Sequence, residues 1–415
     1  MALHTSTILA RTPTAILSHI SRLSTTYTDH AVAFALNANA PELPTLVSRL
    51  TKISCQTIGC LSAPLPGLAS EGFISCSLVV FDKRNALSVR STIPGRAAPQ
   101  VGRWHAFRQR NDKSEEELPP GMENGLSESI NWDNVWDRSA GDNTLPKELQ
   151  ALRPGDVNSF IYFTDNAPEG LSNSLALLPC ATKLGLVASS TPFITGRPVT
   201  LFHNENVHSS GAVGIALTGK GPPISNIEFP GLRCITPPLT VTRSEGNLVN
   251  ELDGGNPSKL LVAAIQKHGI EDNGSFKDDN FYLGAFQDDK LSQMYHIISG
   301  DPSRGTIALE SHAAPAEGTK IQMYYSPKSA CAEIPTRYTQ PQPDRRALAF
   351  MASSSDMPPE IAQLSEGGDD AIHLLPDTFL AASENGFSLS RSQDGVSEGA
   401  WRCTVAGGLA GLEWP

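Results

Sequence analysis

The stretch from Gly211 to Pro257, rich in glycine, proline and β-branched residues, most constrains how this chain can fold. Residues 212–217 are a short continuous apolar run, which is typical of a buried strand, and glycines and prolines follow it. Two further strand-like runs occupy residues 239–242 and 248–252, with the turn Glu245-Gly246-Asn247 between them. Alternation of β-branched and polar residues around such a turn predicts a β-hairpin.

The end of the same stretch predicts the start of a helix. Pro257 suits the first helical turn, where its missing N–H costs nothing, and Asn256 or Ser258 can cap the exposed backbone donors. The apolar run at residues 260–265 continues the helix. The stretch therefore predicts strand, hairpin and helix in that order.

The remaining chain repeats strands and amphipathic helices. In the first sixty residues, strands separated by helical patterns indicate βαβ units and a largely parallel beginning. Residues 72–81 are almost continuously apolar, so we expect a strand buried on both faces. Strands continue beyond residue 281 in the rhythm of a meander. The fold class we predict is α/β, with two lobes that contain mixed sheets and flanking helices.

Composition excludes several classes of protein. The net charge of −11 and the pI near 5.4 argue against a nucleic-acid-binding protein, which needs a basic face. Seven cysteines without a Cys-x-x-Cys pair form neither a disulfide framework nor a zinc motif, so we expect reduced thiols in the cytoplasm or nucleus. No apolar run approaches the length of a membrane span, so we expect no membrane partner.

The first 28 residues leave two interpretations open. They lack Asp and Glu and are rich in Ser and Thr, as mitochondrial transit peptides are. They also read as a first β-α unit, with a strand at residues 4–9 and a helix opened by Thr12-Pro13. We favour the β-α unit because its helical pattern runs directly into the next strand.

Residues 111–150 differ from their surroundings in being strongly acidic, with Pro119-Pro120-Gly121 in the middle. This composition predicts a solvated, disordered insertion. Trp132 and Trp136 lie within it. They either dock the insertion onto the parent domain or form an acidic-aromatic motif for a protein partner.

The Gly211–Pro257 stretch also carries a family resemblance. It is similar to a motif of the FIST family, with matches at these positions: Gly231, Arg233, Cys234, Pro237, Pro238, Val241, Thr242, Glu245, Gly246, Asn247, Glu251, Leu252, Asp253, Gly254 and Pro257. A second, weaker resemblance lies at Gly59-Cys60, Ser62 and Ala63, where the family has a glycine- and cysteine-bearing turn. The resemblance covers roughly residues 3–330 and is strongest from Gly211 to Gln322. It implies a FIST N-terminal-like domain at residues 1–210 and a FIST C-terminal-like domain at 211–415.

The resemblance further implies a sensory or adaptor module that holds a small polar ligand, of amino-acid-like character, without transforming it. The residues it points to are Cys60, Arg233, Thr242 and Asp253, although Asp253 is more simply explained by a turn in which its side chain bonds its own backbone. An alternative is an interaction component of a ubiquitin-ligase pathway, because one relative carries an F-box. We expect no F-box in this chain.

Catalytic and metal motifs are sparse. Residues 214–220 follow a phosphate-loop pattern, but Gly221 stands where Ser or Thr must ligate magnesium, so we expect no nucleotide cofactor. His203 and His208 could ligate a metal, although isolated surface histidines are the commoner case. Cys60 and Cys234 leave open a thiol-dependent enzyme, which would need a base and a lowered thiol pKa. We predict neither catalysis, cofactor nor metal.

Overall fold

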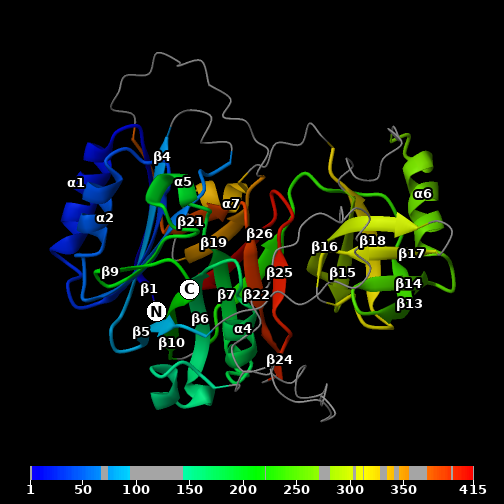
Figure 1. Cartoon of the computed structure of the whole chain (residues 1–415), viewed down its shortest axis with the longest axis horizontal. Helices are drawn as coiled ribbons and strands as arrows, with labels where there is room; N and C mark the ends of the chain where they lie inside the picture. The colour runs from blue at the N-terminus through cyan, green and yellow to red at the C-terminus, as the bar shows by residue number, and fades with distance from the viewer. Residues whose placement is uncertain are drawn as a thin grey trace, which may run out of the picture.

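The computed structural model describes residues 2–66, 73–93, 144–219, 221–270, 281–301, 305–311, 313–327, 334–340, 345–354, 372–393 and 396–414. The chain forms two lobes that lie side by side (Figure 1). The larger lobe contains the strands before residue 229 and those after residue 345, and the smaller lobe contains the strands between residues 233 and 325. The acidic insertion with Trp132 and Trp136 lies outside the described residues, apart from residues 144–150.

The larger lobe begins with a seven-stranded sheet in the order β20-β1-β4-β2-β3-β8-β9. Its strands are β1 (Ala2–Ala10), β2 (Ala31–Asn37), β3 (Gln56–Ser62), β4 (Ile74–Phe81), β8 (Leu201–His203), β9 (Asn206–His208) and β20 (Ile372–Pro376). Helices α1 (Pro13–Ser24) and α2 (Leu43–Leu50) pack apolar side chains, including Ile16, Ile20 and Leu46, against one face. The predicted first β-α unit and the fully buried strand near residues 72–81 are confirmed.

The prediction of a largely parallel beginning is confirmed for β2 and β3, which pair in parallel, and is wrong for β1 and β2. Strand β4 inserts between β1 and β2 and runs antiparallel to both, so these two strands point the same way without being neighbours. Among the described pairings of this sheet, β2 with β3 is the parallel one. The sequence pattern gives the direction of β1 and β2 correctly but cannot show that a later strand separates them.

A second sheet of six strands packs against the first and has the order β25-β22-β7-β6-β10-β5. Its strands are β5 (Ala86–Ser91), β6 (Val157–Thr164), β7 (Thr182–Val187), β10 (Ala212–Thr218), β22 (Phe387–Ser390) and β25 (Trp401–Cys403). Helix α4 (Glu169–Leu175) packs on its other face. Strands β6 and β7 are parallel, whereas β10 runs antiparallel to its neighbours β5 and β6.

Strands from both sides of the predicted boundary at residues 210/211 therefore share one sheet. A further four-stranded sheet has the order β11-β26-β19-β21, with β11 (Ile224–Glu228), β19 (Arg346–Ala352), β21 (Thr378–Ser383) and β26 (Leu409–Trp414). It too combines strands distant in sequence. The assignment of residues 1–210 and 211–415 to two FIST-like domains stays a prediction.

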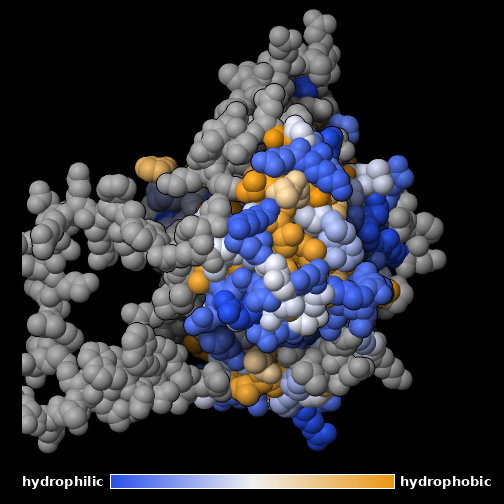
Figure 2. Space-filling view, turned by 90° about the vertical axis from the view of Figure 1, so that its right-hand side faces the viewer, coloured by the Kyte–Doolittle hydropathy of each residue, from blue (hydrophilic) through white to orange (hydrophobic). Residues whose placement is uncertain are grey.

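The smaller lobe is a sheet that closes on itself. Its strands are β12 (Arg233–Cys234), β13 (Leu239–Glu245), β14 (Leu248–Leu252), β15 (Phe281–Gln287), β16 (Lys290–Asp301), β17 (Thr306–Leu309) and β18 (Lys320–Tyr325). Closure occurs because β18 pairs with both β13 and β15. Helix α6 (Pro257–Lys267) packs on β14 and β17. Figure 2 shows this side of the molecule, with mostly hydrophilic residues and smaller groups of hydrophobic ones between them.

The predicted hairpin and the predicted helix start of this lobe are both confirmed. Strands β13 and β14 pair antiparallel across Gly246-Asn247, where Gly246 has a φ of 55°. At the start of α6, the side chain of Asn256 accepts a hydrogen bond from the backbone N–H of Lys259 at 2.9 Å. This bond satisfies one of the donors that a helix N-terminus leaves free.

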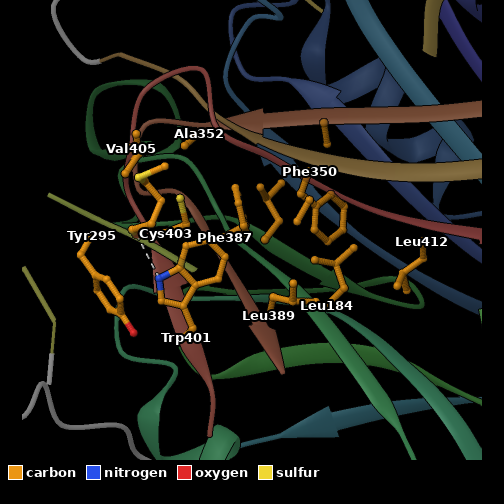
Figure 3. Close-up of a cluster of buried hydrophobic side chains, with 14 of the residues drawn as sticks. Leu184, Tyr295, Phe350, Ala352, Phe387, Leu389, Trp401, Cys403, Val405 and Leu412 are labelled. Atoms are coloured by element: carbon orange, nitrogen blue, oxygen red, sulfur yellow. Dashed lines mark hydrogen bonds between the residues drawn. The ribbon is translucent and has the colours of Figure 1, made fainter. Parts of the chain in front are cut away.

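Trp401 joins the two lobes. From β25 in the larger lobe, its indole N–H donates to the carbonyl of Met294 on β16 at 3.2 Å. Its ring lies edge-on to Phe387 at 5.8 Å and near Phe229 at 6.3 Å. Figure 3 shows this ring at the end of the apolar cluster, with Tyr295 beside it. The apolar core is therefore continuous from one lobe into the other.

A hydrogen-bonded chain from His4 through Ser6 to His19 links the first sheet to α1. The Ser6 hydroxyl lies 2.9 Å from Nε2 of His4 and 3.0 Å from Nε2 of His19, which projects from α1. His19 is 5% exposed. Burial, with smaller contributions from His4 and Arg22, lowers its pKa to about 4, so the imidazole is neutral at pH 7.

The described helices include none with the length and apolar character needed to cross a bilayer.

Candidate functional site

Thr242 and Asp253, two of the residues implicated by sequence, lie together in the β13–β14 hairpin. The Asp253 carboxylate accepts from the backbone N–H of Thr240 at 3.0 Å. The Thr242 hydroxyl donates to Glu251 at 3.1 Å and accepts from the N–H of Gly254 at 3.3 Å. Asp253 has a φ of 48°, so its carboxylate sits at a turn and ties that turn to the neighbouring strand. Both side chains are exposed and have partners within the hairpin.

Arg233 and Cys60 lie elsewhere. Arg233 is exposed on the two-residue strand β12, opposite Tyr325. Cys60 is fully buried in β3, and burial raises the pKa of its thiol. Of the four residues implicated by sequence, the structure therefore brings Thr242 and Asp253 into one hairpin and places Cys60 in a sheet of the other lobe.

A different group of polar side chains gathers where the lobes meet. It begins at the carboxyl ends of the parallel strands β6 and β7, which is where ligands bind in open α/β sheets. Asp165, just after β6, accepts from the backbone N–H groups of Ala167 and Gly211, at 3.0 and 2.6 Å. These bonds hold the chain as it leaves β6 and so fix the position of Asn166.

Arg402 is the cation of this group. One guanidinium nitrogen donates to the Asn166 carbonyl at 3.2 Å, and the other donates to Asn166 Oδ1 at 2.6 Å and to the Asn385 carbonyl at 3.1 Å. Its Nε is buried and has no hydrogen-bond partner. Burial lowers the pKa of Arg402, and the carboxylates of Glu169 and Glu310 oppose that effect. These bonds use three of the five guanidinium N–H groups, and the buried Nε–H is one of the two that remain.

Glu310 brings the smaller lobe into the group. Its Oε2 accepts from the Thr404 hydroxyl of the larger lobe at 3.1 Å and lies 3.3 Å from Nδ1 of His296 on β16. The hydrogen bond with His296 lowers the pKa of Glu310, burial opposes it, and Thr404 and Arg402 add to the lowering. Glu310 is therefore ionised at neutral pH. The side chains of His296 and Glu310 are 33% and 39% exposed, so solvent reaches both.

We call Asn166, His296, Glu310, Arg402 and Thr404 the junction cluster. It combines a guanidinium, a carboxylate, an imidazole, an amide and a hydroxyl contributed by both lobes. Such a set can fix a small polar molecule through several charged and neutral hydrogen bonds. It contains no nucleophile with a lowered pKa.

Sequence analysis did not single out the junction cluster as a site. Its members come from segments near residues 166, 296–310 and 402–404, and no local motif links them. His296 lies in a strand that does resemble the FIST pattern, and Arg402 follows Trp401 in a segment where that resemblance fails. The available signal was a set of isolated polar residues beside apolar strands, which is too common to identify a site.

Two hollows on the described surface lie apart from both groups. One of about 760 Å³ is lined by the β15–β16 turn, residues 315–320 and Glu398. Another of about 650 Å³ lies near the amino ends of β6 and β7 and includes Asn158, Cys180 and Gly219. Neither includes Cys60, Arg233, Thr242, Asp253 or a member of the junction cluster, and the second includes Gly219 and Gly221 of the phosphate-loop pattern.

The histidine pair considered as metal ligands lies in the β8–β9 hairpin, with His203 on one strand and His208 on the other. Burial lowers the pKa of both imidazoles. Within the described residues, no group of three or more His, Cys, Asp or Glu side chains is arranged to hold a metal ion.

The fold defines a mixed α/β protein of two lobes with several mixed sheets and few helices. Residues 168–255 match the family model of the FIST N domain. The matched segment runs from the start of α4, including Glu169, through β10 to the end of the β13–β14 hairpin. It therefore includes most of the Gly211–Pro257 stretch and crosses from one lobe into the other. No curated protein matches the chain.

Proposed function

We propose that the protein is a FIST-type module that binds a small polar ligand at the junction cluster. The observation that carries the proposal is the convergence of polar groups from both lobes at the carboxyl ends of β6 and β7. The FIST N domain match over residues 168–255 supports the same class of function, because that family is linked to sensory binding of small ligands.

A ligand at this position would contact both lobes. Arg402 and Asn166 belong to the larger lobe and Glu310 and His296 to the smaller one, so an occupant that bonds to both groups stabilises their contact. A sensory role follows from this arrangement, since occupancy is coupled to the relation between lobes. The ligand-binding role of Arg233, Thr242 and Asp253 remains a separate prediction.

A screen for ligand-induced thermal stabilisation tests the proposal. It should include cationic, anionic, zwitterionic and neutral metabolites, followed by calorimetric titration of any compound that stabilises the protein. We expect Arg402→Gln to weaken binding by about tenfold or more, because a charged hydrogen-bonding partner is lost. Thr404→Val is a milder second variant that tests the same position if Arg402→Gln does not fold.

A matched control is Arg197→Gln, which removes the same charge at an exposed position away from the cluster. It should bind like the wild type. A ligand whose affinity is unchanged by Arg402→Gln and Thr404→Val would place the site elsewhere. A screen in which no charge class stabilises the wild type would end the proposal.

The ubiquitin-pathway alternative draws its support from the family resemblance. The acidic-aromatic motif for a protein partner, with Trp132 and Trp136, lies outside the described residues. A thiol-dependent reaction at Cys60 is disfavoured because the buried thiol stays protonated at neutral pH. Cys234 is exposed, and its thiol lies 3.1 Å from the carbonyl of Thr236.

A further inference from the structure

Arg90 lies on the inner face of β5, between the two sheets that pack together in the larger lobe. Side chains alternate between the faces of a strand, and along β5 Ala86 belongs to the inter-sheet core, whereas Val89 belongs to the core on the outer face. Arg90 therefore shares the inner face with Ala86. Strand β5 contacts β3 of the first sheet, so this face lies close to the strands opposite.

The guanidinium of Arg90 is fixed by backbone carbonyls, but its Nε–H has no acceptor. The two terminal nitrogens donate to the carbonyls of Ser91, of Ser210 at 2.6 Å and of Ala212 at 2.9 Å. The Nε atom is buried and has no hydrogen-bond partner among the described residues. Because the guanidinium is planar, the bonds to the carbonyls also fix the direction of the Nε–H.

Two histidines of the opposite sheet have nitrogens in the same state. His203 lies across from Ile58 on β3 and His208 lies across from Leu201, and both apolar residues belong to the inter-sheet core. Residues directly opposite each other share a face of the sheet, so both imidazoles lie on the inner face. Nε2 of each ring is buried and has no hydrogen-bond partner within the described part of the chain.

The positive charge of Arg90 acts on both imidazoles. Burial is the main cause of the lowered pKa of His203 and of His208, and Arg90 contributes to the lowering in each. His203 also acts on His208. We call Arg90, His203 and His208 the inter-sheet cluster. Each member has a buried nitrogen without a partner, and such atoms destabilise a fold unless an acceptor or a water molecule completes them.

We propose that the inter-sheet cluster binds a small oxyanion, a carboxylate or phosphate group, at a position separate from the junction cluster. The Nε–H of Arg90 donates a charge-assisted bond to one oxygen, and a neutral imidazole can carry its single proton on Nε2 and donate in the same way. The three residues are partly exposed, so an anion has access from solvent. A metal ion is the less suitable occupant, because the permanent charge of Arg90 opposes it and the described residues contain no group of three metal-binding side chains.

Two carboxylates of the protein also act on Arg90, and one of them gives the test a sign. Each oxygen of Asp165 accepts from a backbone N–H, so this carboxylate is held by its own partners. Glu148 acts on both Arg90 and His203. Its negative charge opposes an incoming anion, so removal of that charge should strengthen anion binding.

The test uses inorganic phosphate as the probe and acetate as a second probe, titrated at pH 7.5 and constant ionic strength into the full chain with isotope-labelled histidine. Binding is measured from the imidazole nitrogen signals in NMR spectra, which report hydrogen bonds at Nε2, and by calorimetry. We expect the signals of His203 and His208 to shift until they saturate. His208→Phe should weaken phosphate binding by about tenfold, the loss typical of a hydrogen bond to a charged group, and His268→Phe, at an exposed position, should not.

Glu148→Gln should tighten phosphate binding by about two- to fivefold, whereas Glu317→Gln, at an exposed position of the smaller lobe, should leave it unchanged. Equal phosphate affinity in His208→Phe and the wild type would overturn the proposal. So would weaker phosphate binding by Glu148→Gln, or binding of zinc without binding of phosphate or acetate. A phosphate response that never saturates would mean that water alone completes the three nitrogens, and would overturn it as well. The imidazole signals of the wild type decide the matter even if His208→Phe does not fold.

Discussion

Acidification should destabilise the protein through His19, by an amount that follows from its burial. The folded protein holds the pKa of His19 at about 4, compared with 6.5 for the exposed group. The unfolded chain therefore binds a proton first as the pH falls. The contribution of neutral His19 to the free energy of unfolding is fully present above pH 6.5 and declines between about pH 6.5 and 4. Below pH 4 this contribution is lost and the free energy changes no further through His19. At about 1.4 kcal/mol per pH unit, the loss is roughly 3 kcal/mol.

The assay is urea unfolding between pH 7.5 and 4, with amide hydrogen exchange of residues 14–24 as a local measure on α1. His19→Gln keeps a polar group near Ser6 but cannot titrate, so its stability relative to the wild type should rise by roughly 3 kcal/mol over this range. Ser18→Ala, on the exposed face of the same helix, is the control and should differ from the wild type by a constant amount. If the free energies of unfolding of His19→Gln and the wild type change in parallel with pH, the idea that burial keeps His19 neutral is refuted.

Three further outcomes follow. In the native protein, alkylation should modify the exposed thiols of Cys55, Cys180 and Cys234, whereas Cys60, Cys76 and Cys403 should react only after unfolding. Mass spectrometry of the labelled peptides measures this. Labelling of Cys60 in the native protein would contradict its burial. Gly386→Ala should lower the free energy of unfolding by at least about 2 kcal/mol, because φ is 79° and a Cβ would collide with the Cys403 carbonyl. Gly155→Ala, where a Cβ meets open space, should change it little. Asn256→Ala should cost about 1 kcal/mol by removing the helix cap, with Asn256→Asp retaining most of it in the same denaturation assay.

Structural features that depend on interactions between residues close in sequence could be predicted from the sequence. The turn at Gly246-Asn247 and the cap at Asn256 depend on backbone preferences and on hydrogen bonds between near neighbours, and the structure contains both. The buried strand β4 was evident from its continuous apolar run. Periodicity and capping are local signals, so they hold without knowledge of the tertiary structure.

Strand order and the junction cluster depended on contacts that no local pattern encodes. Strand β4 separates β1 from β2 because tertiary packing chose the pairing, and the helical connections alone suggested parallel neighbours. Arg402 meets Asn166 across 236 positions of the chain. A polar residue at the end of an apolar strand could equally be an isolated surface group. The side chains that such a residue contacts can be identified only once the order and direction of the strands are known.

The larger lobe is assembled from two parts of the chain that the smaller lobe separates. Strand β26, at residues 409–414, lies between β11 and β19 in its sheet and pairs with both. During translation, β11 must therefore wait for almost two hundred more residues to leave the ribosome before its neighbour exists. The smaller lobe, complete by Tyr325, can close earlier. Synthesis thus yields an intermediate with a finished closed sheet and an open-edged larger lobe, a state that molecular chaperones are suited to protect.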